Sequence, residues 1–160
     1  MAQRAREEGP RLHSVRISAE RANARAASQA LWKGLLRFNR RHAGPLRYKR
    51  TVLCARDAKG KLLGGLIMQT YWRETYVELL WLSERARAGG TGARLVAEAE
   101  RRARKLGSHH IHLNTYSFQA PRFYEKQGYR RFGALSGSPG GHQRYFYMKR
   151  LRGAGSGAGR

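Results

Sequence analysis

The strongest constraint on the fold is a change of hydrophobic period across one glycine cluster. Before the cluster, Thr75–Leu82 ("TYVELLWL") has the length and composition of a buried strand. After it, residues 91–106 repeat apolar side chains at helical spacing and stop at Gly107, where a C′ glycine is expected. The chain therefore passes from a strand into a helix through Arg87-Ala-Gly-Gly-Thr-Gly92.

The remaining periodicity predicts a mixed α/β domain. Apolar spacing at Ala27, Leu31, Leu35 and Phe38 predicts a helix that follows Ser18, and Pro121 opens a short helix that ends at Gly128. Alternating or apolar runs predict further strands at 12–17, 48–56, 61–72, 109–116, 129–133 and 143–151. This order predicts a central sheet with flanking helices, and 48–82 forms an antiparallel meander.

The chain has the length of one domain. Its 160 residues can bury one core, so we expect a disordered tail at 1–11, a folded domain at 12–151 and a flexible Gly-rich tail at 152–160. No apolar run reaches transmembrane length and the first residues lack a signal-peptide pattern, which predicts a cytoplasmic protein without a membrane partner. The single cysteine, Cys54, excludes an internal disulfide and a cysteine-only zinc site.

The net charge is strongly positive. The chain has 33 Lys and Arg against 10 Asp and Glu, a formal charge of +23 that attracts any polyanion. Two explanations stay open: a base-composition bias toward arginine codons, or a real affinity for nucleic acid or ribosomes. Highly cationic targets are disfavoured by the same Coulomb repulsion.

The glycine cluster has the properties of an anion site. Glycines let a ligand approach the backbone, and the free amides and dipole of a helix N-terminus favour phosphate. Arg85 and Arg87 add positive charge, and Thr91 adds a hydroxyl. Neither the ATP-type phosphate loop nor the dinucleotide-binding glycine pattern is present. On local grounds an ordinary glycine-rich turn remains the alternative.

Two motifs in the right order resemble one family. Arg87-x-x-Gly90-x-Gly92 after "VELLWL" is similar to the acyl-CoA pyrophosphate-binding motif of the GNAT superfamily of N-acyltransferases. "SFQAPRFYEKQGY" (117–129) resembles that family's later motif. The resemblance spans about 15–151 and implies the GNAT fold, a mostly antiparallel sheet of about seven strands flanked by about four helices.

The resemblance implies acetyl-CoA as co-substrate and no metal. Main-chain amides would hold its pyrophosphate at Arg87, Ala88, Gly89, Gly90, Thr91, Gly92 and Ala93. Trp81 and Leu82 would hydrogen-bond the pantetheine arm through main-chain groups, as an added strand does. Ser117 stands where the family usually has asparagine, so its contact with the cofactor would be shorter, water-mediated or absent.

Amine acetylation needs a proton acceptor and a donor for the leaving thiolate. The resemblance makes Tyr124 the candidate acid, with a core tyrosine as the alternative. We take Glu78, in the strand before the glycine cluster, as candidate base, with a surface residue or an arginine partner as the alternative. The Leu82 amide is a candidate to polarise the thioester carbonyl.

The acceptor site has weaker candidates. His142, in the loop before the last strand, is expected to bind the acceptor together with Tyr116 and Tyr145, although a turn residue and packing aromatics are the alternatives. His109, His110 and His112 are expected to be ordinary strand histidines, since no suitable metal ligand accompanies them.

The resulting hypothesis is an N-acetyltransferase that moves an acetyl group from acetyl-CoA to an amine by direct attack in a ternary complex. The acceptor is a small molecule or a protein amine, and the family resemblance implies a monomer or homodimer. The alternative is a basic GNAT-fold protein that binds nucleic acid or ribosomes with little turnover. Nonspecific nucleic-acid binding through the basic surface is compatible with either hypothesis.

Overall fold

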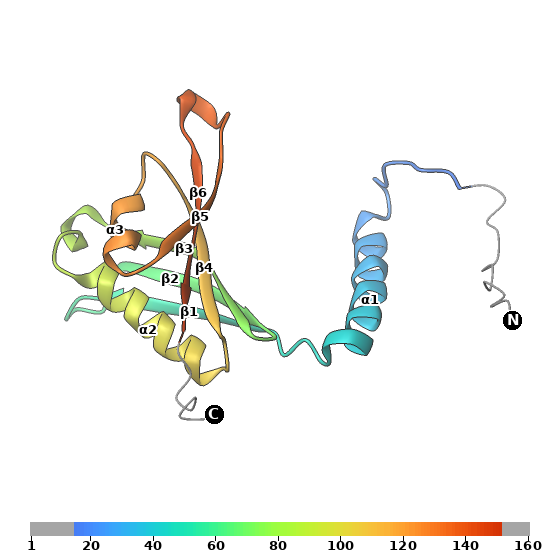
Figure 1. The fold of residues 1–160 in the computed structure, drawn as a ribbon, viewed down its shortest axis with the longest axis horizontal. Helices are drawn as coiled ribbons and strands as arrows, with labels where there is room; N and C mark the ends of the chain where they lie inside the picture. Colours follow the sequence, from blue (N-terminus) through green and yellow to red (C-terminus); the bar gives the residue numbers. More distant parts are fainter. Residues whose placement is uncertain (1–14, 152–160) are drawn as a thin grey trace, which may run out of the picture.

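The computed structural model describes residues 15–151, and the predicted tails 1–11 and 152–160 lie outside them. One six-stranded sheet has the order β1-β2-β3-β4-β6-β5 (Figure 1). Its strands are β1 (Lys49–Arg56), β2 (Leu62–Tyr71), β3 (Glu74–Leu82), β4 (His110–Tyr116), β5 (Arg130–Leu135) and β6 (Arg144–Arg150). The helices are α1 (Ala24–Ala43), α2 (Thr91–Lys105) and α3 (Pro121–Lys126), with short 3-10 turns η1 (Glu84–Ala86) and η2 (Pro139–Gly141).

The N-terminal elements differ from the prediction. Residues 15–17 form no strand, and 12–14 lie outside the described range, so the described sheet has six strands rather than about seven. α1 begins at Ala24 and not after Ser18, because the Glu20 carboxylate accepts the Asn23 amide (2.9 Å) in a turn that precedes the helix. Three α-helices, rather than about four, occur in residues 15–151.

The sheet is antiparallel at every neighbour except β3 and β4. β1, β2 and β3 form the predicted meander. The parallel pairing of β3 with β4 runs only from Glu74 opposite His110 to Val77 opposite Leu113. β3 continues to Leu82 and β4 to Tyr116, so their second halves separate and leave an opening in the middle of the sheet.

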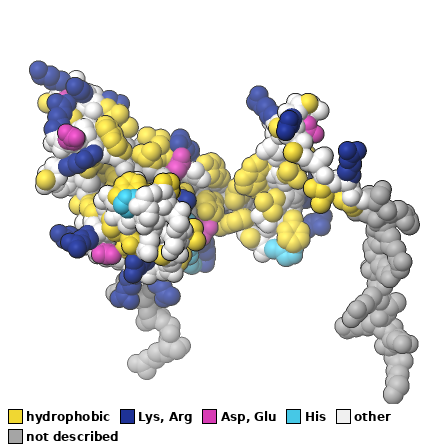
Figure 2. Space-filling model, turned by 90° about the horizontal axis from the view of Figure 1, so that it is seen from above, with side chains coloured by type: hydrophobic (Ala, Val, Ile, Leu, Met, Phe, Trp, Pro, Cys, Tyr) yellow, Lys and Arg dark blue, Asp and Glu magenta, His cyan; other side chains and the backbone are white. Residues whose placement is uncertain are grey.

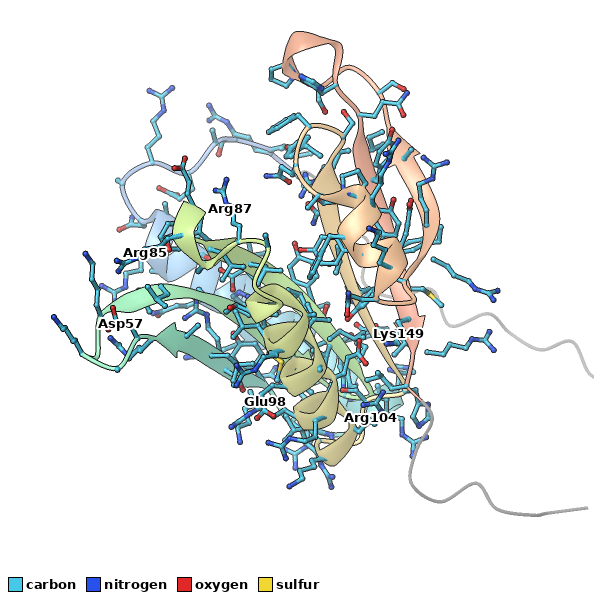
Figure 3. All side chains as sticks on the ribbon, turned by 90° about the vertical axis from the view of Figure 1, so that its left-hand side faces the viewer. Asp57, Arg85, Arg87, Glu98, Arg104 and Lys149 are labelled. Atoms are coloured by element: carbon cyan, nitrogen blue, oxygen red, sulfur yellow. The ribbon has the colours of Figure 1, made fainter. Side chains whose placement is uncertain are left out.

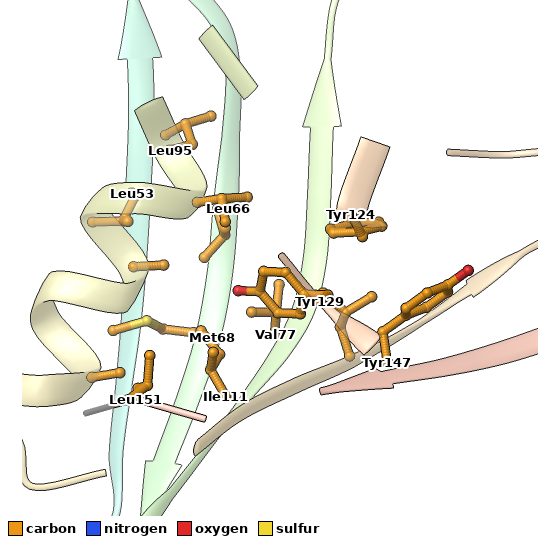
Figure 4. Close-up of a cluster of buried hydrophobic side chains, with 14 residues drawn as sticks. Leu53, Leu66, Met68, Val77, Leu95, Ile111, Tyr124, Tyr129, Tyr147 and Leu151 are labelled. Atoms are coloured by element: carbon orange, nitrogen blue, oxygen red, sulfur yellow. The ribbon is translucent and has the colours of Figure 1, made fainter. Parts of the chain in front are cut away.

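The core lies between the sheet and the α2/α3 side (Figures 1 and 4). α2 packs through the predicted stripe of Leu95, Ala99 and Ala103, and its two alanines let the helix approach the strands closely. The fully buried strand side chains include Leu66, Met68, Ile111 and Tyr147. This side of the sheet is called the packed face below.

A buried ion cluster ties α2 to β6. The Glu100 side chain is 8% exposed, and each of its carboxylate oxygens accepts from Lys149 Nζ at 2.9 Å. Its Oε2 also accepts from Arg104 at 3.3 Å. Lys149 also donates to the Gln127 carbonyl (2.8 Å). Figure 3 shows Lys149 and Arg104 approaching from the strand and the helix. Lys149 is therefore the main partner of Glu100. Removing its ammonium group would leave a buried carboxylate with Arg104 as its remaining partner.

Within residues 15–151 no helix packs on the opposite side of the sheet, which is called the open face below. Its side chains include Val52 and Cys54 of β1, Ile67 of β2 and Leu79 and Trp81 of β3. Val52, Leu79 and Trp81 are about half exposed. α1 lies on this side but stands away from the sheet (Figure 1), and no helix within 15–151 is long and apolar enough to cross a membrane.

Candidate active site

The opening between β3 and β4 leaves strand edges without a neighbour. Ser83 donates its amide to the Leu63 carbonyl of β2 (2.8 Å). Because successive residues of a strand point their main-chain groups to alternate sides, the Leu82 amide and carbonyl point into the opening and those of Trp81 point toward β2. An extended ligand can therefore add to β3 at Leu82, and the Trp81 main chain is not available for it.

A β-bulge in β3 sets this geometry. Ile67 pairs with Leu79 while Met68 pairs with Val77, so Glu78 is the extra residue. A bulge bends its strand and interrupts regular pairing. The parallel ladder with β4 ends at Val77, immediately before Glu78, which places that carboxylate at the start of the opening.

The glycine loop presents free amides beside the opening. α2 has no side-chain N-cap, and the first helical amide with an intrahelical acceptor is that of Arg94, which donates to the Gly90 carbonyl. The amides of Thr91, Gly92 and Ala93 are consequently left for a ligand. A helix of this length also carries positive potential at this end.

The three glycines of the loop have different functions. Gly90 has φ +73°, a conformation that glycine adopts without strain. Gly92 is buried, and an added Cβ would lie 3.3 Å from the Phe123 ring and 3.4 Å from Leu82. Gly89 has open space around it. Gly92 is therefore needed for close packing of α2 against α3 and β3 rather than for phosphate access.

The two arginines before the glycines already have partners. Arg85 lies 3.5 Å from Asp57 of the β1–β2 turn, and the Arg87 Nε donates to the Leu82 carbonyl at 3.3 Å (Figure 3). Ala88 adopts φ +62°, which is uncommon for a residue with a side chain. The Arg87 side chain thus lies across the entrance to the opening.

Tyr124 lies on the packed face. Its ring contacts Phe123, Tyr129 and Tyr147 in an aromatic group (Figure 4), and it is 7% exposed. Burial raises the pKa of the Tyr124 phenol to about 12. The group consequently keeps its proton throughout the neutral range and can act only as a donor there.

Glu78 lies on the open face, across the sheet from Tyr124. Its carboxylate accepts from the Gln69 amide (2.8 Å) and from Arg50 (3.5 Å). These two donors lower the pKa of Glu78 below its ordinary value, the Gln69 hydrogen bond most. Glu78 is therefore a carboxylate at neutral pH.

The structure joins two residues that were predicted for different ligands. Ser117 lies at the end of β4, and its Oγ is 3.1 Å from the His142 Nδ1. The Gln143 amide also donates to that hydroxyl (3.3 Å). Ser117 therefore holds the loop before β6 against β4, and its hydroxyl is engaged within the protein.

Tyr116 and Tyr145 do not meet in one pocket. Tyr116 lies on the open face, where its ring stacks on Phe118 and faces the Arg144 guanidinium. Tyr145 pairs with Thr115 and lies on the packed face under Arg131. The pairing register of β4 with β6, which local sequence does not specify, separates them.

A polar network on the open face was not predicted. Asn114 donates to the Tyr76 hydroxyl (2.8 Å) and accepts from Arg144 (2.8 Å), so it links β3, β4 and β6. The period-2 alternation of β4 could have placed Asn114 on the same face as Tyr116. Arg50 and Gln69, the partners of Glu78, come from two other strands and carry no local signal.

The histidine cluster has a neighbouring carboxylate that was not predicted. β3 begins at Glu74, one residue before the predicted strand. Glu74 lies 3.5 Å from His110, and burial lowers the pKa of the neighbouring His112. Within residues 15–151 no group of three or more His, Cys, Asp or Glu side chains is placed to hold a metal ion.

Comparison with known proteins identifies this arrangement. A sequence model described as "Acetyltransferase (GNAT) family" matches residues 29–129. The chain belongs to the GNAT family. It is 38% identical over 110 residues to blasticidin-S acetyltransferase of Streptomyces morookaense, a match that covers 68% of this chain and 79% of the relative.

Solved GNAT structures have the same fold. An acetyltransferase from Bacillus cereus superimposes with a TM-score of 0.78 at 29% identity, covering 86% of this chain and 98% of the other. A Bacillus anthracis structure with acetyl coenzyme A bound has a TM-score of 0.58 at 22% identity and covers 64% of this chain and 63% of the other. The GNAT protein described here is an acetyl-CoA-dependent N-acetyltransferase.

The residues of this GNAT protein fit acetyl-CoA. The amides of Thr91, Gly92 and Ala93 are free to hold its pyrophosphate, and the Leu82 amide points into the opening where the extended arm would lie, although the Leu82 carbonyl accepts from Arg87 Nε (3.3 Å). The loop amides and the unpaired edge of β3 are therefore the groups that the pyrophosphate and the extended arm of acetyl-CoA need.

Proposed function

We propose that the protein acetylates an amino group of a small molecule, with blasticidin S as the first compound to test. The observation that carries the proposal is the 38% identity to blasticidin-S acetyltransferase over 79% of that enzyme. The proposal is also supported by the position of Glu78 at the start of the opening, with Tyr124 on the other face of the sheet.

Each face of the sheet supplies one side chain to the proposed reaction. When bound, acetyl-CoA supplies a thioester whose carbonyl carbon accepts the amine. Glu78 attracts the acceptor's ammonium group on the open face and takes its proton, directly or through water, so that the neutral amine can attack. The lowered pKa of Glu78 keeps it charged and thus able to attract a cation at neutral pH.

Tyr124 acts on the leaving sulfur from the packed face. As the nitrogen–carbon bond forms and the carbon–sulfur bond breaks, negative charge develops on the thiolate. The pKa of the Tyr124 phenol, about 12, lies above that of an ordinary thiol, about 8.5. This difference favours a hydrogen bond that stabilises the thiolate over complete proton transfer. The Leu82 amide, which points into the opening, is the candidate donor to the carbonyl oxygen.

The position of the Cys54 thiol supports direct transfer in a ternary complex. Cys54 is the only cysteine, and it lies on β1 opposite Gly65 of β2. β2 separates it from β3, so it is about 10 Å or more from the opening at the usual strand spacing. An acyl-cysteine step therefore has no nucleophile within reach.

The test is acceptor-dependent thiol release. Purified protein with acetyl-CoA is given blasticidin S, a streptothricin, a polyamine or a peptide with a free N-terminus, and the products are checked by mass for one added acetyl group. We expect saturable release with a small amine and none above background with the peptide. Thiol release with the peptide and with none of the small amines would indicate a protein acetyltransferase instead.

If no acceptor is acetylated while acetyl-CoA still binds, the proposed substrate class is wrong, although the protein remains a member of the family. Failure to bind acetyl-CoA would contradict the assignment of the loop and the opening. The alternative of a nucleic-acid-binding protein would then be tested with duplex DNA at two salt concentrations, because such binding weakens steeply with salt.

A further inference from the structure

We propose that two copies of the protein exchange their first helices, so that α1 of one copy packs on the open face of its partner's sheet. α1 is a helix whose apolar side is exposed among residues 15–151. Leu31, Leu35 and Phe38 lie on one side at spacings of four and three, and they are 75%, 51% and 61% exposed. Figure 2 shows hydrophobic side chains exposed in this part of the molecule.

The open face is the matching surface in the same chain. Val52, Leu79 and Trp81 are 55%, 47% and 51% exposed, and Ile67 lies between them in the sheet. A 20-residue helix is about 30 Å long, which is enough to cross the strands of this half of the sheet. One face of the sheet is covered by α2, and the second face needs a helical layer of this kind.

The connection to β1 holds α1 away from the open face of its own copy. Leu46 accepts a hydrogen bond from the Trp72 amide (3.0 Å), and Arg47 is fixed at φ +48°. Leu36, on the flank of α1, lines a hollow with Trp72 at the β2–β3 turn. Leu36 therefore faces the β2–β3 turn, and the Leu31 side of the same helix points elsewhere and is exposed.

The size of the two surfaces favours a second copy. Reciprocal exchange uses both surfaces twice, and burying several large apolar side chains at each contact would remove on the order of 1,200–2,000 Å² from water, the size of a specific interface. Glu74 and Glu78 on the open face already have His110 and Arg50 as neighbours, so the contact with α1 is expected to be mainly apolar. Two copies of a chain with a net charge of +23 repel each other at long range, so added salt should strengthen this dimer.

Exchange would also complete the acceptor side of the site. Glu78 lies on the open face, and its side chain is 37% exposed. A helix from the partner would form a wall there and exclude water from the amine. This consequence rests on the proposed function, but the dimer itself can be measured without any substrate.

The experiment combines mass in solution with the reactivity of the native thiol. Cys54 is exposed on the open face, so a docked helix should protect it. We expect the full chain to sediment as a dimer, with Cys54 reacting about tenfold or more slowly with a chromogenic disulfide reagent than in a monomer. Leu31→Ser/Leu35→Ser should weaken dimerisation at least about a hundredfold and release the thiol. Lys33→Ser/Arg37→Ser, on the polar side of α1, should change neither.

Several results would overturn the proposal. A monomer with a reactive thiol shows that α1 has no partner copy. A monomer with a protected thiol shows that α1 folds onto its own sheet, and a dimer with a reactive thiol shows that another surface associates. Flotation of a monomer with anionic phospholipid vesicles, lost in the double leucine variant, would identify α1 as a membrane-surface helix. Acetyl-CoA binding by both variants confirms that they are folded.

Discussion

The two faces of the sheet differ in how far one chain completes them. On the packed face, α2 and α3 bury a continuous core and close the back of the cofactor site with Phe123, Leu82 and Gly92 in contact. On the open face, apolar strand residues and Glu78 are exposed, and α1 stands apart. We therefore expect cofactor binding to depend on the packed face and acceptor binding on the open face, so that substitutions on the two faces have separate effects.

The largest effect is expected on the packed face. Lys149→Met removes the ammonium that pairs Glu100 and should lower the free energy of unfolding by about 3 kcal/mol. Urea denaturation measures this. Lys126→Met, an exposed lysine at the end of α3, is the matched control and should change little. Equal losses in the two variants would contradict the description of a buried ion cluster.

Tyr124→Phe should lower turnover about a hundredfold while acetyl-CoA affinity stays close to that of the parent. Because the raised pKa keeps Tyr124 protonated until the pH approaches about 12, the parent should show no alkaline loss of rate from this group in the neutral range. Tyr147→Phe removes a neighbouring buried phenol that donates to Glu125 and should affect stability more than rate. A normal rate in Tyr124→Phe would remove this tyrosine from the mechanism.

Gly92→Val should cost about 2 kcal/mol of stability, because its side chain would overlap Phe123 and Leu82. Gly89→Val meets open space and should leave the thermal midpoint unchanged. Scanning calorimetry measures the difference in thermal midpoint between these two variants of the same loop. If Gly89→Val were the more destabilising, the assignment of the packing glycine would be wrong.

Glu78→Gln tests the open face and should reduce the rate about tenfold without changing the stability of the core. The pKa of Glu78 is lowered, so its carboxylate is present at ordinary pH and is lost only as the pH falls below the normal carboxyl range. The deficit of the variant should be greatest at mildly acidic pH, where the acceptor is most protonated, and shrink as the pH rises. A constant ratio of rates from pH about 6 to 9 would indicate a role other than proton removal.

Local patterns in the sequence were sufficient for most of the fold. The boundaries of the six observed strands agree with the prediction within about two residues, although no strand forms at 15–17 as predicted. The stripe of α2 and the start of α3 at Pro121 are confirmed. The strand-to-helix turn at the glycine cluster is also as predicted. These features depend on neighbours in the chain, through period, turn residues and helix ends.

The remainder depends on contacts between distant strands. No local signal specifies that Gln69 meets Glu78, that Ser117 meets His142, or that Tyr145 turns away from Tyr116. The amphipathic pattern of α1 predicts a helix with a buried side but does not name the surface that buries it. The bulge at Glu78 likewise follows from the pairing of β3 with β2.

The bulge at Glu78 changes which residues of β3 face the core. Thr75 and Val77 face the core as odd-numbered residues, whereas beyond Glu78 the even-numbered Leu80 and Leu82 do so. If β3 kept all of its residues and paired with β2 without a bulge, the alternation of Thr75 and Val77 would continue along the strand. Leu79 and Trp81 would then face the core, and the main chain of Leu82 would point toward β2. The bulge therefore shifts the register of the later half of β3 by one residue, and the Leu82 main chain points into the opening only because of that shift.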